Sequence, residues 1–179
     1  MKDILRIMDR DTLLEISYED LIKYHGRLHI GGVAIAFKLM ELSFELLSPV
    51  AVPRRGSFSF ASALGEAATG VLDGVEMVTR ARSRGNMTAD PAQGQKADAP
   101  LSANGGKFYF ELGYQEHKLG LALAPGLVPD EFIVLSKAAM SGSLDAEGKH
   151  RLQEVKEELA ASLMSREAAS LFIYRFIEA

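Results

Sequence analysis

Residues 17–47 read SYEDLIKYHGRLHIGGVAIAFKLMELSFELL, and this stretch decides the fold that we expect. Ser17 and Asp20 have the spacing of a capping box, so a short helix is predicted to begin at this point. His25-Gly26 is predicted to end or bend it, because glycine commonly sits just past a helix end. A long amphipathic helix should follow and should stop before Pro49, since the residue preceding a proline disfavours helical geometry.

The long helix shows two stripes at helical spacing. The stripe predicted to face the core contains Val33, Phe37, Met40, Phe44 and Leu47, and the opposite, small-to-polar stripe contains Ala34, Lys38, Glu41 and Glu45.

The rest of the chain mixes helical and strand patterns. Alternating or continuous apolar runs predict strands at residues 57–61, 107–112, 119–123 and 171–177. Helices are predicted at 71–79, 130–140 and 152–163, with Phe132 and Leu135 buried, and residues 86–106 are predicted to form a long loop. We therefore expect an α+β class, with an antiparallel sheet, packed helices, a core over residues 17–125 and a C-terminal helical extension over 129–179.

Composition excludes several function classes. The chain of 179 residues has no cysteine and no tryptophan and carries a net charge of −4. Disulfides, thiolate catalysis and cysteine zinc sites are therefore excluded, and the acidic balance argues against nucleic acid as a partner. We expect no membrane partner, because the most apolar run, residues 30–47, is interrupted by charges. The N-terminus does not resemble a signal peptide, so a cytoplasmic location is expected.

Four segments occur in the same order as motifs of one known family. They are YHGRLHIG (residues 24–31), GVLDGVEMVT (70–79), RGNM (84–87) and GKFYF (106–110). They resemble the motifs of the FmdE family, which is named after a component of formylmethanofuran dehydrogenase and whose first motif is Phe-His-Gly-His-x-Cys-Pro-Gly. The resemblance extends over about residues 18–123. It implies helices packed on an antiparallel sheet, a homodimer and a link to one-carbon metabolism.

The departures from the family pattern matter as much as the matches. The second histidine of the family motif is Arg27 in this chain, and its cysteine is His29. Two further family cysteines correspond to Gly70 and to a position near Ala81. Chemistry that relatives perform through those cysteines cannot operate here in the same form.

His25, His29 and Asp73 are candidate metal ligands. Histidines four residues apart share one face of a continuous helix, and Asp73 could add an oxygen ligand or orient an imidazole. Such a set would suit a divalent metal such as Zn, Ni or Fe. The alternative is that His25 caps its helix and His29 packs in the core. His25 and Asp73 could also form a catalytic acid–base pair.

A basic group is the second candidate site. If the matched blocks surround one pocket, as the resemblance implies, several cationic side chains would converge on a small anionic ligand. The residues are Arg27, Arg80, Arg82, Arg84 and Lys107, with Thr79 beside them. The alternative is a solvated basic loop.

Three functions therefore stay open. The first is a protein that binds a metal ion or a small anionic molecule, and the second is an enzyme that uses His25 and Asp73. The third is a structural protein that docks a partner through the acidic helix face of residues 154–158.

Overall fold

The chain begins with an antiparallel hairpin that is absent from the sequence predictions. In the computed structural model, which describes residues 4–178, β1 (Ile4–Asp9) pairs with β2 (Thr12–Ser17). Leu5, Ile7 and Ile16 are buried, because alternate residues of a strand point to the same face. The hairpin therefore adds to the core ahead of residue 17, where the core was predicted to begin.

The predicted capping box and short helix are confirmed. The Ser17 hydroxyl accepts the Asp20 amide at 3.2 Å, and the Asp20 carboxylate accepts the Ser17 amide at 2.9 Å. Helix α1 (Tyr18–His25) follows and ends at Gly26, whose φ of 89° belongs to the region that favours glycine.

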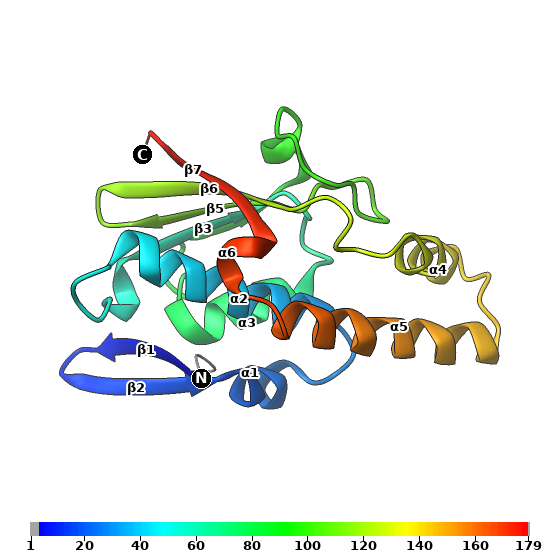
Figure 1. The fold of residues 1–179 in the computed structure, drawn as a ribbon, viewed down its shortest axis with the longest axis horizontal. Coiled ribbons are helices and arrows are strands. Elements are labelled where there is room, and N and C mark those ends of the chain that lie inside the picture. Colours follow the sequence, from blue (N-terminus) through cyan, green and yellow to red (C-terminus); the bar gives the residue numbers. More distant parts are fainter. Residues whose placement is uncertain (1–3, 179) are drawn as a thin grey trace.

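Helix α2 (Ile30–Leu47) has the predicted extent but not the predicted polar face. Lys38 and Glu41, assigned to the polar stripe, are buried and form an ion pair of 2.9 Å. The reason is tertiary: α2 lies between the sheet and the layer that holds β1, β2 and α1, and other helices flank it (Figure 1). Both stripes of α2 therefore face protein.

The main sheet has five strands in the order β4-β3-β5-β6-β7. The strands are β3 (Phe58–Ser62), β4 (Met87–Ala89), β5 (Tyr109–Tyr114), β6 (His117–Leu123) and β7 (Phe172–Ile177). The expected antiparallel sheet is only partly correct, because β3 and β4 pair in parallel over three residues. The remaining pairs are antiparallel, and the α+β class is confirmed.

The remaining helices cover one face of this sheet and extend beyond it (Figure 1). They are α3 (Thr69–Thr79), α4 (Asp130–Met140), α5 (Ala146–Met164) and α6 (Ala168–Leu171), with short 3-10 turns at Arg55–Ser57 and Pro91–Gly94. The segment after residue 129 is not only helical, since β7 completes the sheet. Phe132 and Leu135, predicted to be buried, are half-exposed, because α4 projects from the body and packs mainly on α5.

None of the helices in residues 4–178 combines the length and the apolar character needed to cross a bilayer.

Candidate functional site

The turn between α1 and α2 brings two imidazoles together. The helix does not continue through this turn, because α1 ends at Gly26 and His29 is the N-cap of α2. His25 and His29 nevertheless lie with their ring centroids 5.7 Å apart. The predicted proximity is present, although a tight turn produces it rather than one helix face.

Each of these rings is held through its Nδ1 atom. His25 Nδ1 lies 2.7 Å from the Asp73 carboxylate, and His29 Nδ1 lies 2.8 Å from the Thr69 hydroxyl. A carboxylate only accepts hydrogen bonds when ionised, so neutral His25 donates from Nδ1 and keeps a lone pair on Nε2. That Nε2 atom is buried and has no hydrogen-bond partner in the structure.

The environment keeps His29 neutral. Burial lowers the pKa of His29 below its usual value, and the positive charge of Lys156 and the electrostatic influence of the neighbouring His25 ring lower it further, against a smaller opposing effect of Asp73. An imidazole in this state can accept a proton or offer a lone pair to a metal near neutral pH.

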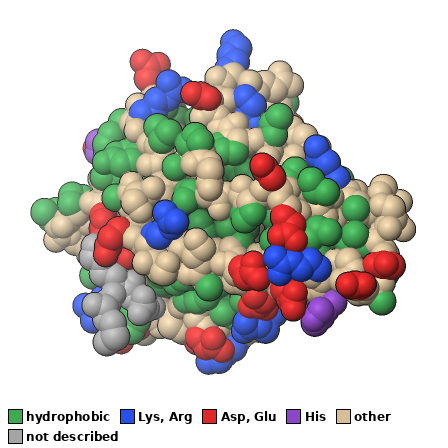
Figure 2. Space-filling view, turned by 45° about the vertical axis from the view of Figure 1, so that its right-hand side comes forward, with side chains coloured by type: hydrophobic (Ala, Val, Ile, Leu, Met, Phe, Trp, Pro, Cys, Tyr) green, Lys and Arg blue, Asp and Glu red, His purple; other side chains and the backbone are tan. Residues whose placement is uncertain are grey.

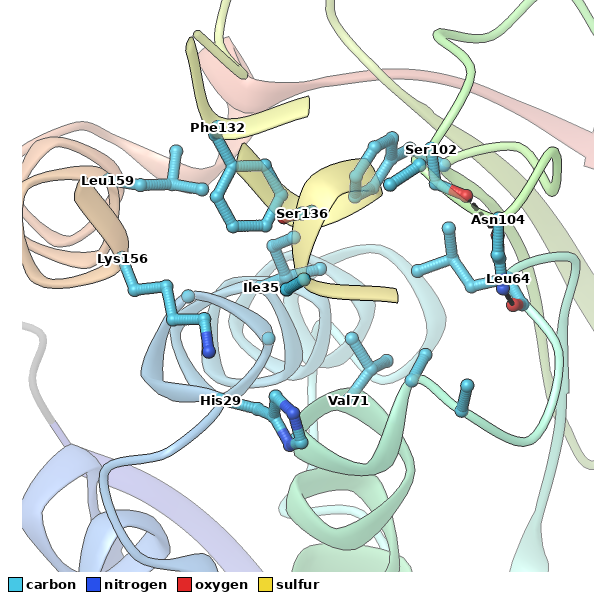
Figure 3. Close-up of a pocket in the computed structure, with 18 of the residues that line it drawn as sticks. His29, Ile35, Leu64, Val71, Ser102, Asn104, Phe132, Ser136, Lys156 and Leu159 are labelled. Carbon is cyan, nitrogen blue, oxygen red and sulfur yellow. Dashed lines mark hydrogen bonds between the residues drawn. The ribbon is translucent and has the colours of Figure 1, made fainter. Parts of the chain in front are cut away.

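His29 lines an apolar cavity of about 340 Å³ (Figure 3). Most of the wall is aliphatic or aromatic, and none of the lining residues is an aspartate or a glutamate. The polar contributors are His29, Lys156, Ser102, Asn104 and Ser136. The volume falls in the range of about 300–1,000 Å³ that is typical of small-molecule sites.

Two helix N-termini meet at one end of this cavity. Gly31 and Gly32 of α2 and Gly70 and Val71 of α3 all contribute to its wall. The helices approach closely because both have glycine at the contact: a Cβ on Gly70 would lie 2.4 Å from the His29 carbonyl oxygen. Neither helix has a side-chain cap or an acidic residue in its first turn. Their partial positive charges therefore remain uncompensated at the cavity.

Lys156 brings a full positive charge to the same end. It extends from α5 toward His29 (Figure 3) and donates to the Leu28 carbonyl at 2.9 Å. Burial lowers its pKa below the usual value for lysine. Lys156 lies within the segment 154–158 that the sequence predicts to be an acidic, partner-docking face, but it is half-buried and faces the cavity. No local signal identifies it, because it meets residues about 128 positions earlier in the chain.

The predicted basic group does not converge on this cavity. Arg27 pairs with Glu157 at 2.6 Å, and Arg82 pairs with Glu66 at 3.0 Å. The Lys107 ammonium donates to backbone carbonyls of Gln95 and Ala97 in the 86–106 segment.

Thr79 and Arg80 also lie outside the cavity lining. The Thr79 hydroxyl is buried and donates to the Val75 carbonyl within the last turn of α3. Arg80 caps that helix and lines a different hollow together with Arg84.

The acidic face of α5 is largely paired within the chain. Arg151 contacts Glu131, Glu154 and Glu158 at 2.8–3.3 Å. Acidic side chains gather around a basic one on the face formed by α4 and α5 (Figure 2).

The metal candidates form a pair rather than a cluster. Within residues 4–178, no three histidine, aspartate or glutamate side chains are arranged to hold a metal ion together. Asp73 contacts His25 and so lies in the position of a residue that orients an imidazole. A metal bound here would have two protein nitrogens and would complete its coordination with solvent or a ligand.

A scan against models of protein families finds no match, and a search of curated proteins finds none either.

Proposed function

We propose that this protein binds a small organic acid with an apolar body in the cavity next to His29. The observation that carries the proposal is the composition of the wall: mainly apolar, without a carboxylate, and positive at one end. An apolar wall favours a hydrocarbon or aromatic body, and the few convergent polar groups fix the orientation of its charged group.

The positive end of the cavity has the donors that a carboxylate needs. Lys156 uses one of its three ammonium donors on Leu28, so further donors remain for a ligand. The starts of α2 and α3 add oriented backbone dipoles, which favour anions at helix N-termini. His29 can add a hydrogen bond and becomes a stronger donor if the ligand induces its protonation.

A matched pair of ligands tests this proposal. Octanoate and octanol have the same chain length and differ in charge. We expect octanoate to bind with a dissociation constant of about 1 mM or tighter, and octanol to bind about tenfold more weakly. Isothermal titration calorimetry measures both. Equal affinity for the two compounds would show that the positive end does not recognise a charge, and would contradict the proposal.

A variant pair tests the role of Lys156. Lys156→Gln removes the charge but retains a donor for the Leu28 carbonyl, and should weaken octanoate binding by about tenfold while leaving octanol unchanged. Lys149→Gln makes the same change on an exposed part of α5 and serves as the control. Loss of affinity in both variants would indicate a general charge effect.

A divalent metal ion at His25 and His29 is the second candidate, and a separate observation favours it. Both rings are held at Nδ1, which leaves the Nε2 atoms for a ligand, and the His25 Nε2 atom is buried without a partner. Two imidazoles on one tetrahedral ion have ring centroids about 5 Å apart, close to the 5.7 Å found here. A carboxylate in the cavity could supply a further oxygen ligand.

Elemental analysis separates the two candidates. Protein made without a histidine tag and supplemented with zinc should retain close to one ion per chain, and His25→Ala should lose it. A zinc content near zero in the wild type would rule out the metal, while octanoate binding could still be present.

An acid–base enzyme is less well supported by this geometry. Asp73 does orient His25, as that hypothesis requires. However, His29 rather than His25 lines the cavity, and the His25 Nε2 atom is buried. A substrate in the cavity would meet His29 first.

A further inference from the structure

A second cluster of charged side chains lies where the β1–β2 turn meets the C-terminal end of α3. Arg10, Arg80 and Arg84 line one hollow there. Asp9, Asp11, Thr12 and Leu14 complete the lining. This hollow shares no lining residue with the cavity next to His29.

Neighbouring arginines already perform the usual structural roles. Arg55 donates to the Val78 and Met77 carbonyls at the end of α3 and pairs with Asp9 at 3.1 Å. Arg82, two residues from Arg80, pairs with Glu66. The Met77 and Val78 carbonyls at the helix end and the carboxylates of Asp9 and Glu66 are therefore already partnered.

The three arginines of the hollow have no such role. Within residues 4–178, the guanidinium groups of Arg10, Arg80 and Arg84 form no hydrogen bond and no ion pair. The three side chains are exposed, so water screens part of the repulsion between their like charges, and an anion bound among them would relieve the rest. Asp11 is the nearby acid without an ion pair in this part of the chain, and it opposes an anion only in part.

Backbone geometry holds these residues in position. Arg10 and Arg80 have φ values of 56° and 61°, which non-glycine residues adopt uncommonly. Arg10 lies in the hairpin turn, and Arg80 is the C-cap of α3, where its amide donates to the Glu76 carbonyl. The Arg84 guanidinium lies against Gly56, where a Cβ would come within 1.7 Å of its Nη1 atom.

We propose that this hollow binds the phosphate group of a small molecule. A phosphate offers several oxygens to guanidinium groups, which bind it through paired hydrogen bonds and stay charged at all physiological pH values. The Thr12 hydroxyl lines the same hollow and can donate one more hydrogen bond. The site would be independent of the organic-acid cavity.

Calorimetry with three probes tests the proposal. Inorganic phosphate, pyrophosphate and adenosine triphosphate distinguish free phosphate from phosphate carried by an organic molecule. We expect at least one to bind at low ionic strength, and Arg80→Ala and Arg84→Ala each to weaken it by about tenfold. Asp11→Asn should strengthen binding, which a purely structural role for these residues would not produce.

Arg82→Ala is the matched control. It removes one positive charge two residues from Arg80, but that charge is already paired with Glu66. It should change the affinity by less than about twofold. Absence of binding for all three probes, or an equal loss in Arg82→Ala and Arg80→Ala, would overturn the proposal. Thermal unfolding of each variant confirms that it is folded.

Discussion

The cavity next to His29 has two walls that are built in opposite ways. The α2–α3 wall is part of the core: Ile35 and Val71 are buried, and Gly32 and Gly70 bring the helices into close contact. The α4 wall has no buried residue, and Met140, which lines the cavity, is 64% exposed.

The connections of α4 match this difference. Gly126 precedes the helix and Gly142 follows it, both with positive φ values of 80° and 71°. An exposed ion pair joins Glu131 of α4 to Arg151 of α5, and Phe132 and Ile133 pack against the core while only partly buried. Elements with few buried contacts open at low free-energy cost. The α2–α3 wall therefore supplies the polar end of the site in a fixed position. We expect α4 to open more readily and so to control access to the cavity.

The largest expected effect concerns two ion pairs outside the cavity lining, one within α2 and one between α4 and α5. Glu41→Gln leaves Lys38 buried without its charged partner inside α2, so the free energy of unfolding should fall by about 3 kcal/mol. Glu131→Gln breaks the exposed pair with Arg151 and should not move the urea midpoint measurably. Urea denaturation measures both. Equal losses would mean that α4 is as firmly fixed as α2.

A smaller loss of stability is expected when the side chain at a close helix contact is enlarged. Gly70→Ala places a Cβ against the His29 carbonyl and should destabilise the fold by about 2 kcal/mol, despite the better helix propensity of alanine. Ala139→Val adds two carbon atoms to exposed α4 and should nevertheless cost less than about 1 kcal/mol, mainly through the lower helix propensity of valine. If Gly70→Ala were neutral in urea denaturation, the close contact of the helix starts would not be rigid.

The predictability of the fold depends on how local each feature is. The capping box at Ser17 and Asp20 was predictable because two residues three positions apart determine it. The hairpin of β5 and β6 follows from adjacent apolar runs. The β1–β2 hairpin has no clear period-two signal, because residues 4–9 read ILRIMD and carry apolar side chains on both faces of the strand, so their alternating burial appears only in the structure.

The site depended on contacts that no local pattern encodes. The proximity of His25, His29 and Asp73 was anticipated, since two of them share one turn. Lys156 reaches that turn from a distant helix, and its spacing resembles that of any solvated residue. The burial of Lys38 was likewise unpredictable, because it depends on which elements surround α2.

Hydrogen exchange should reveal a difference in local stability between α4 and α2. Amides of α4 should exchange faster than those of α2, because α4 has no buried side chain. Octanoate at about ten times its dissociation constant should slow the α4 amides about tenfold, if opening of α4 disrupts the cavity. Mass spectrometry of peptic fragments measures both, with the β1–β2 hairpin as an internal control. Identical α4 rates with and without octanoate would contradict the role of α4 in access, although calorimetry could still show binding.

The smallest expected effect is a change in the free energy of unfolding with pH, caused by protonation of His29 at the α2–α3 wall. The pKa of His29 is lower in the folded protein than in the unfolded chain, where it is near the ordinary value of about 6.5. As the pH falls from about 7 to about 5, the unfolded imidazole therefore binds its proton first, and the free energy of unfolding decreases. Above that range both states are neutral at this residue, and the contribution does not change.

His29→Gln should flatten this part of the stability profile in urea denaturation at pH 7.5 and 5.5. Bound octanoate should reduce the loss in the wild type, because its carboxylate stabilises protonated His29 against the effect of burial. The same pH dependence in His29→Gln and wild type would show that another group controls it. If octanoate does not reduce the loss of stability at low pH, its carboxylate does not lie near His29. The Lys156 ammonium alone would then bind it.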